Sequence, residues 1–197
     1  LGSELGVDPL ESTTTLFFAL DAGHEDGAAV DLGAGPHLDP GAQRHNLPQQ
    51  NTRFVGRQRE IDAVVDLLAR DGTRLVTITG LGGVGKSRLA LEVAARRLAD
   101  HEDGVWFVEL AGTGTPELVP TAIATALRLD MKSGRGATAA LTDHLRDKRV
   151  LLVLDNFEHL VEAAATLHDL LEAAPGLALL VTSRVALGLR AESIFEL

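Results

Sequence analysis

The sequence has no cysteine, and this absence excludes disulfides and thiolate metal sites. It is also poor in basic residues, because 18 lysines and arginines stand against 28 aspartates and glutamates, for a formal net charge of −10. Such an acidic balance argues against nucleic-acid binding by this part of the protein. The lack of cysteine is consistent with a reducing compartment.

Long apolar runs are missing as well. No stretch approaches the ~20 apolar residues that a membrane-spanning helix needs, and the start lacks the basic-then-apolar order of a signal peptide. We therefore expect a cytoplasmic protein without membrane contacts. The 197 residues suffice for one sizeable domain. Because the sequence starts at Leu1 and stops inside the strand-like Ser193–Leu197, we expect it to be part of a longer chain.

The most specific stretch is LVTITGLGGVGKSRL, Leu75–Leu89. Gly80, four further residues and then Gly85-Lys86-Ser87 match the phosphate-loop pattern. The residues before Gly80 are apolar and β-branched, as in a buried strand, and those after Lys86 have apolar side chains at helical spacing. A glycine-rich turn without a ligand is the alternative, and the strand before and the helix after the loop argue against it.

The chemistry of this loop follows from its glycines. They allow the backbone to curl so that N–H groups point inward and, with the positive end of the next helix, form a cradle for an anion. We predict that Lys86 reaches the β- and γ-phosphates of ATP or ADP and that Ser87 binds Mg²⁺. The predicted nucleotide contacts of the loop are Gly80, Gly82, Gly83, Val84, Gly85, Lys86, Ser87 and Arg88.

An acidic residue that can bind a metal ion is predicted at the end of another apolar run. Asp155 ends the run that starts at Val150, and an acid in this place can hold Mg²⁺ directly or through water; an ordinary strand-end aspartate is the alternative. In many ATPases the next residue is an acid that orients the attacking water. Here Asn156 can hydrogen-bond water but cannot accept its proton. Glu158 either substitutes for that acid or is a solvated helix-start residue.

Two arginines are candidates for phosphate contacts. Arg184 follows a further apolar run and is predicted to sense the γ-phosphate, unless it is solvated. Arg57 belongs to a short segment, Phe54–Arg57, that precedes a helical pattern. If this segment lies over the base, Val55 contacts adenine and Arg57 reaches phosphate or ribose. A helix-start arginine without a ligand is the alternative.

Strand-like apolar runs alternate with helical patterns along most of the sequence, which predicts a parallel sheet covered on both faces. We therefore expect an α/β, three-layer P-loop NTPase fold with about five strands over residues 52–197. Residues 1–20 are weakly periodic and are expected to be a short helical remnant. Residues 21–51 are rich in Gly, Asp, Pro and His, which predicts a flexible linker.

Four motifs together resemble the STAND class of P-loop ATPases, close to the NB-ARC module. They are FVGRQREI (Phe54–Ile61), GLGGVGKSRLA (Gly80–Ala90), LLVLDNFEHL (Leu151–Leu160) and LLVTSR (Leu179–Arg184). The first departs from the tightest family pattern, because Gln58 and Arg59 stand between Arg57 and Glu60. The resemblance implies binding of ATP or ADP with Mg²⁺, and catalytic positions at Lys86, Asp155, Asn156 and Arg184.

Two further stretches narrow the resemblance. Glu4–Leu20 is similar to the last helices of bacterial transcriptional activator domains, and His45–Arg57 is similar to the linker that follows them. This order is typical of SARP-family regulators of antibiotic biosynthesis, and a related one occurs in large LuxR-type ATPase regulators. It implies a nucleotide-operated switch, DNA binding through an absent upstream domain, and a nucleotide-dependent homo-oligomer of the full-length protein. The family's helical and winged-helix parts are not in this sequence.

The alternative function is a P-loop kinase or metabolic ATPase that acts on a small substrate. A kinase needs a lid with phosphate-clamping arginines, and a GTPase needs an Asn-Lys-x-Asp-like guanine reader; the sequence contains neither. These absences favour the switch. We expect its ATP hydrolysis to be slow, because Asn156 stands where a water-polarising acid would be expected.

Overall fold

The structure is a computed structural model that describes residues 44–50, 54, 56–130 and 136–197. Its strands are β1 (Leu75–Thr79), β2 (Val105–Glu109), β3 (Val150–Asp155), β4 (Leu177–Thr182) and β5 (Glu192–Glu196). Its helices are α1 (Gln58–Ala69), α2 (Lys86–Arg96), α3 (Val119–Ala126), α4 (Ala137–Leu145) and α5 (Ala164–Ala173). Short 3₁₀ turns lie at Leu98–Asp100, Pro116–Leu118, Phe157–His159 and Val161–Ala163. The predicted helical remnant, residues 1–20, lies outside the described residues, as does residue 55.

The five strands form one sheet in the order β2-β3-β4-β1-β5, and every neighbouring pair is parallel. All residues of β1 and β3 are buried, as expected for a parallel sheet with both faces covered. This confirms the predicted α/β P-loop fold and its fifth strand. Across the described ranges, no helix is both long and apolar enough to cross a membrane.

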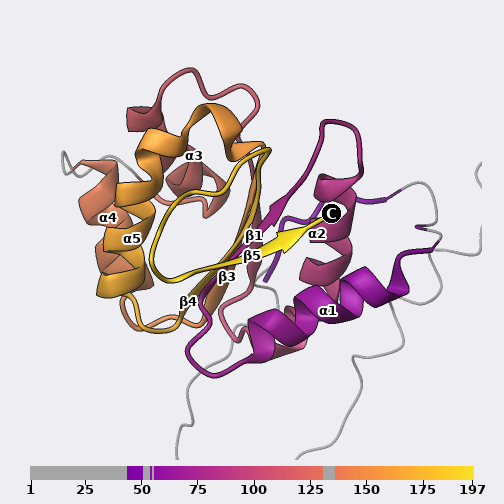
Figure 1. Cartoon of the computed structure of the whole chain (residues 1–197). Coiled ribbons are helices and arrows are strands. Elements are labelled where there is room, and N and C mark those ends of the chain that lie inside the picture. Colours follow the sequence, from indigo (N-terminus) through magenta and orange to yellow (C-terminus); the bar gives the residue numbers. More distant parts are fainter. Residues whose placement is uncertain (1–43, 51–53, 55, 131–135) are drawn as a thin grey trace, which may run out of the picture. The chain divides into compact units, whose positions relative to one another are not determined.

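The sheet separates two hydrophobic cores. Helices α1 and α2 cover one face, and α3, α4 and α5 cover the other (Figure 1). Successive strand residues contribute to opposite cores: Val153 packs with α1 and α2, and Leu154 packs with the other three helices. These three layers hold the strands in register, so that the loops after β1, β3 and β4 meet at one edge of the sheet.

The chain after β3 does not continue directly into one helix. The apolar spacing from Leu160 onward predicts a continuous helix, but two 3₁₀ turns precede α5, which begins only at Ala164. Asn156 adopts a left-handed conformation with φ 63°, which asparagine tolerates better than most residues. Phe157 and Leu160 are both fully buried. Burial of these two side chains therefore shapes the segment, which helical periodicity alone does not predict.

The outer edge of β2 is covered by part of the stretch that composition predicts to be a linker. The N–H of Val105 donates to the carbonyl of Arg44 at 2.9 Å, and His45 pairs with Val105 as an isolated parallel bridge. The Asn46 amide donates to the Phe107 carbonyl at 2.8 Å and accepts from the Phe107 N–H at 2.5 Å. These contacts satisfy polar groups of an edge strand. Arg44, His45 and Asn46 thus contact the sheet, although composition alone predicts a flexible linker over residues 21–51.

Candidate functional site

A pocket of about 440 Å³ lies at the carboxyl ends of the strands. Loops from three separate parts of the sequence line it: the phosphate loop after β1, the turn after β3 and the end of β4. Its lining residues are Gly82, Gly83, Gly85, Lys86, Ser87, Arg88, Asn156, Glu158 and Arg184. In open parallel sheets the carboxyl edge is where ligands bind. The structure therefore brings most of the predicted site residues to one place.

The backbone of the phosphate loop has a shape that glycine alone permits. Gly83 and Gly85 have positive φ angles of 75° and 98°. At Gly80, with φ 148°, a Cβ atom would lie 2.6 Å from the carbonyl oxygen of Leu197, and the side chain of Val84 packs beside it. Gly80 and Val84, both predicted nucleotide contacts, are therefore packed against their neighbours and are not among the residues that line the pocket. Helix α2 begins at Lys86, and the first N–H groups of a helix have no partner within the helix, which suits an anion.

Lys86 is the buried cation of the site. Only 8% of the residue is exposed, and its Nζ donates to the carbonyl oxygens of Gly80 at 2.9 Å and Leu81 at 3.0 Å. Both acceptors are neutral, so they satisfy the hydrogens without neutralising the charge. A buried charge is costly without a counter-charge. A phosphate in the cradle supplies one, so the donor set fits a phosphate group.

A buried hydroxyl joins the ends of β3 and β4. Thr182 Oγ1 donates to Asp155 Oδ1 at 2.6 Å and accepts from the N–H of Asn156 at 3.0 Å. Thr182 is fully buried and Asp155 is 7% exposed. The hydroxyl therefore orients the carboxylate and fixes the turn that follows it. The sequence analysis missed Thr182, although a hydroxyl residue at the end of an otherwise apolar strand was a visible signal.

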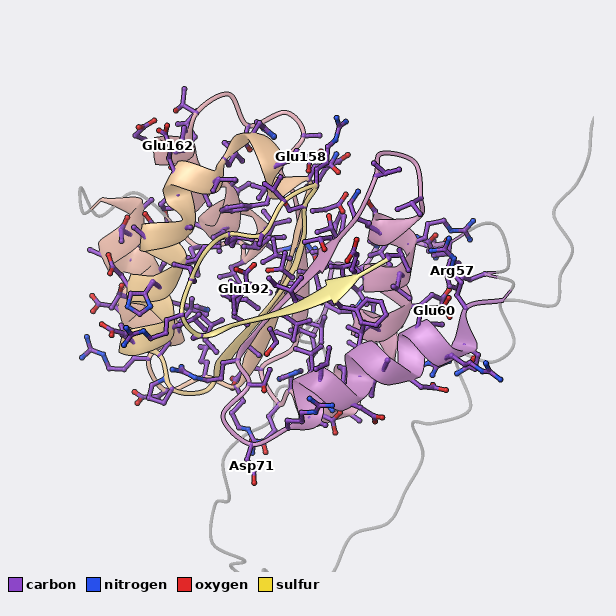
Figure 2. All side chains as sticks on the ribbon, viewed as in Figure 1. Arg57, Glu60, Asp71, Glu158, Glu162 and Glu192 are labelled. Atoms are coloured by element: carbon purple, nitrogen blue, oxygen red, sulfur yellow. The ribbon has the colours of Figure 1, made fainter. Side chains whose placement is uncertain are left out.

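Arg184 and Glu158 form an ion pair in the pocket lining, with Arg184 Nε 3.0 Å from Glu158 Oε1. The Arg184 guanidinium also lies over the phosphate loop, 3.5 Å from where a Cβ on Gly82 would be. The Arg184 side chain is 65% exposed and that of Glu158 is 24% exposed. Figure 2 shows Glu158 beyond the ends of the strands, on the side of the phosphate loop. Glu158 is thus neither fully solvated nor remote from the site.

The segment before α1 also approaches the loop. Arg57, at the start of α1 in Figure 2, has a left-handed backbone with φ 58°. Its Nη1 is buried, has no hydrogen-bond partner, and is 4.0 Å from where a Cβ on Gly85 would lie. The Arg88 guanidinium lies 5.5 Å from the centroid of the Phe54 ring, which ties this segment to α2. An orphaned buried donor beside the phosphate loop fits an anionic ligand. Val55 lies outside the described residues.

The oxygen donors available to a metal are few. The described part of the chain has no group of three or more His, Cys, Asp or Glu residues that could hold one. The site offers the hydroxyl of Ser87 and the carboxylate of Asp155. Mg²⁺ is commonly held by one or two carboxylates together with substrate phosphates and water. The donor set therefore fits a magnesium ion that arrives with a nucleotide.

Sequence comparison places this site in a known family. A family model described as an AAA domain matches residues 69–185, which include β1, the phosphate loop, Asp155 and Arg184. The chain belongs to this AAA family.

Curated relatives include regulatory proteins. The regulatory protein AfsR of Streptomyces coelicolor is 32% identical over 208 residues, covering 94% of this chain and 20% of AfsR. A Mycobacterium tuberculosis protein named as an HTH-type transcriptional regulator is 42% identical over 127 residues, covering 64% of this chain and 14% of that protein. An uncharacterised M. tuberculosis protein is 41% identical over 150 residues, covering 76% of this chain and 38% of its own length. The chain therefore covers less than half the length of each of these relatives.

A solved structure supports the fold. The STAND protein with a tetratricopeptide repeat sensor from Pyrococcus horikoshii superposes with a TM-score of 0.52 at 17% identity, covering 76% of this chain and 24% of that one. At this identity the likeness shows the fold alone.

Proposed function

We propose that this AAA domain is a switch operated by ATP and ADP with Mg²⁺. The observation that carries the proposal is the phosphate loop, where the buried Lys86 ammonium and the unpartnered Nη1 of Arg57 adjoin glycine backbone. Exchange of ADP for ATP would change the arrangement of this domain relative to its neighbours in a longer protein. A ligand shifts such an equilibrium only through different affinities for the two states.

Each site residue has a proposed role. Lys86 and the loop N–H groups bind the β- and γ-phosphates, and Arg184 contacts the γ-phosphate from the other side of the pocket. Ser87 and Asp155 hold the magnesium ion, which neutralises phosphate charge when it is bound. Arg57 reaches phosphate or ribose, and Val55 contacts adenine. Gly80, Gly82, Gly83, Val84, Gly85 and Arg88 complete the binding loop.

We further propose that hydrolysis is slow. Asn156 lines the pocket and holds water by hydrogen bonds, but its amide cannot take the proton of the attacking water. General-base assistance commonly contributes ~10²–10⁴-fold to a rate. A switch benefits from a slow step, because the triphosphate state then persists long enough to be read by a neighbouring domain.

For the longer protein we propose a cytoplasmic transcriptional regulator. The similarity to AfsR and to an HTH-type regulator supports this class. The resemblance of Glu4–Leu20 to the end of an activator domain, and of His45–Arg57 to the linker that follows it, favours a SARP-type or LuxR-type regulator of antibiotic biosynthesis. DNA contacts would come from another domain, because this chain carries a net charge of −10. Nucleotide-dependent homo-oligomerisation would belong to the full-length protein.

Calorimetric titration with ATP and Mg²⁺ tests the binding proposal. We expect Lys86→Ala to weaken ATP binding at least ~10-fold, because a hydrogen-bonded charge contributes ~1.5–3 kcal/mol. Lys148→Ala is the control, since this lysine pairs with Asp103 at 3.8 Å outside the pocket lining. Unchanged ATP affinity in Lys86→Ala would overturn the proposal. The nucleotide retained on purification, identified by chromatography after denaturation, provides an independent check.

A further inference from the structure

The two residues of the Arg184–Glu158 ion pair differ in how tightly the surrounding structure holds their side chains. Glu158 belongs to the 3₁₀ turn Phe157–His159, which is anchored by the fully buried Phe157. His159 Nε2 forms a hydrogen bond with the Thr113 carbonyl oxygen at 3.0 Å, which fixes the other end of this turn. The Arg184 side chain, by contrast, is 65% exposed. The carboxylate is therefore held in place, and the guanidinium has room to move.

The charges that line the pocket allow a bound anion to compete with Glu158 for Arg184. The described lining residues include three cations, Lys86, Arg88 and Arg184, and a single acid, Glu158. Its carboxylate binds Arg184 through Oε1, while Oε2 is buried without a hydrogen-bond partner. An anion above Gly82 would compete with Glu158 for the guanidinium, because Arg184 already lies over that part of the loop.

We infer that Glu158 is a positioning residue that sets how strongly the site prefers a nucleoside triphosphate to a diphosphate. Glu158 holds Arg184 at the mouth of the pocket. The terminal phosphate of a triphosphate must therefore displace the Glu158 carboxylate before it can bind the Arg184 guanidinium. A diphosphate does not extend to this position and leaves the pair intact. The ion pair thus weakens the binding of a triphosphate but not the binding of a diphosphate. This inference rests on the proposed nucleotide binding by the phosphate loop.

The expected effect is modest, because Arg184 is mostly exposed and exposed ion pairs contribute little. We expect Glu158→Gln, which keeps the shape and removes the charge, to tighten ATP binding about two- to fivefold. ADP affinity should stay unchanged. Arg184→Gln should weaken ATP binding about tenfold, as expected for a lost charged phosphate contact, and also leave ADP affinity unchanged.

The double variant Glu158→Gln/Arg184→Gln separates this inference from simple repulsion between Glu158 and phosphate. If Glu158 acts through Arg184, its replacement has no effect on ATP affinity once Arg184 is gone. Direct repulsion would instead give the same tightening with and without Arg184, and that result would overturn the inference. Glu158→Asp, which withdraws the carboxylate, should behave like Glu158→Gln if contact with Arg184 is what matters.

Titrations of the whole 197-residue chain with ATP and with ADP, each with Mg²⁺, provide the measurement. Glu162→Gln is the matched control, because Glu162 lies in the next 3₁₀ turn and does not line the pocket. Equal shifts of ATP and ADP affinity in Glu158→Gln would refute the inference. Unchanged nucleotide affinity in Lys86→Ala would instead refute the proposed function, so the two failures are distinguishable.

Discussion

At the carboxyl ends of the strands, polar groups are buried in apolar surroundings, whereas at the amino ends the backbone packs closely in turns. The carboxyl ends hold the buried Lys86, Asp155 and Thr182. At the amino ends, a Cβ on Gly104 would collide with the backbone carbonyl of Arg44, and one on Gly176 would collide with that of Lys148. The two ends of one sheet therefore differ in what they bury.

The difference follows from the direction of the strands. After β1, β2 and β3 the chain leads from the carboxyl end of the strand toward a helix start, where N–H groups lack partners and favour anions. At the amino end of a strand the chain arrives from the end of a helix, and a tight turn is enough to connect the two. Substitutions at the carboxyl ends should change ligand binding or hydrolysis, whether or not they also change stability. Those at the amino ends should change only the free energy of unfolding.

The largest effect is expected at the carboxyl ends, from Asn156→Asp. A carboxylate at this position can accept the proton of the attacking water, so we expect ATP hydrolysis to rise about 100-fold. Aspartate also tolerates the left-handed backbone of residue 156, so the fold should be retained. Phosphate release under saturating ATP is the measurement. Asn156→Gly, which keeps the backbone but has no side chain, is the control, and equal rates in both variants would contradict the prediction.

The next effect should come from the amino ends, with Gly176→Ala. A Cβ at this position would meet the backbone carbonyl of Lys148, which cannot move aside as a side chain can. We expect a loss of about 3 kcal/mol in the free energy of unfolding, measured by urea denaturation. Gly114→Ala is the control, since a Cβ there has no neighbour within 4 Å. If ATP affinity rather than stability changed in Gly176→Ala, the division between the two ends would fail.

A pair of threonines on adjacent strands gives a smaller and sharper contrast. Thr182 and Thr77 are both fully buried, but Thr182 holds Asp155 and Asn156, whereas Thr77 Oγ1 has no hydrogen-bond partner. Thr182→Val should therefore cost about 2 kcal/mol of unfolding free energy and weaken the magnesium dependence of ATP binding. Thr77→Val should be neutral or stabilising. Similar losses in both variants would show that shape, and not the hydroxyl, matters.

The smallest effect is the pH dependence of stability from two histidines near the amino ends. Burial, with Arg97 next, lowers the pKa of His101 below its ordinary value of 6.5, and burial with Lys148 lowers the pKa of His144 likewise. The unfolded chain therefore binds protons more readily. The free energy of unfolding should be highest above pH 6.5 and fall as the pH drops below it. A double replacement, His101→Gln/His144→Gln, should flatten this slope in urea titrations, and an unaltered slope would contradict the assignment.

The sequence alone determined the fold class and the phosphate loop. Both depend on local patterns: apolar runs of strand length, and Gly80, Gly85, Lys86 and Ser87 at a fixed spacing. Glycines at a fixed spacing and apolar residues at a fixed period predict the same local structure in any fold. The sequence also selected Asp155 and Arg184, since a polar residue at the end of a buried strand, or shortly after it, lies at the edge of the sheet. The roles of these residues remain predictions.

Only the tertiary structure decided what those polar residues contact. The hydrogen bond between Thr182 and Asp155 requires β3 and β4 to be neighbours, and the contact of Glu158 with Arg184 requires the same adjacency. The pairing of Arg44 with Val105 depends on β2 being the edge strand. Strand order is set by the burial of both faces of the sheet, which involves the whole domain. No spacing within a single motif encodes it, so contacts between residues far apart in sequence follow from the packing of the two cores.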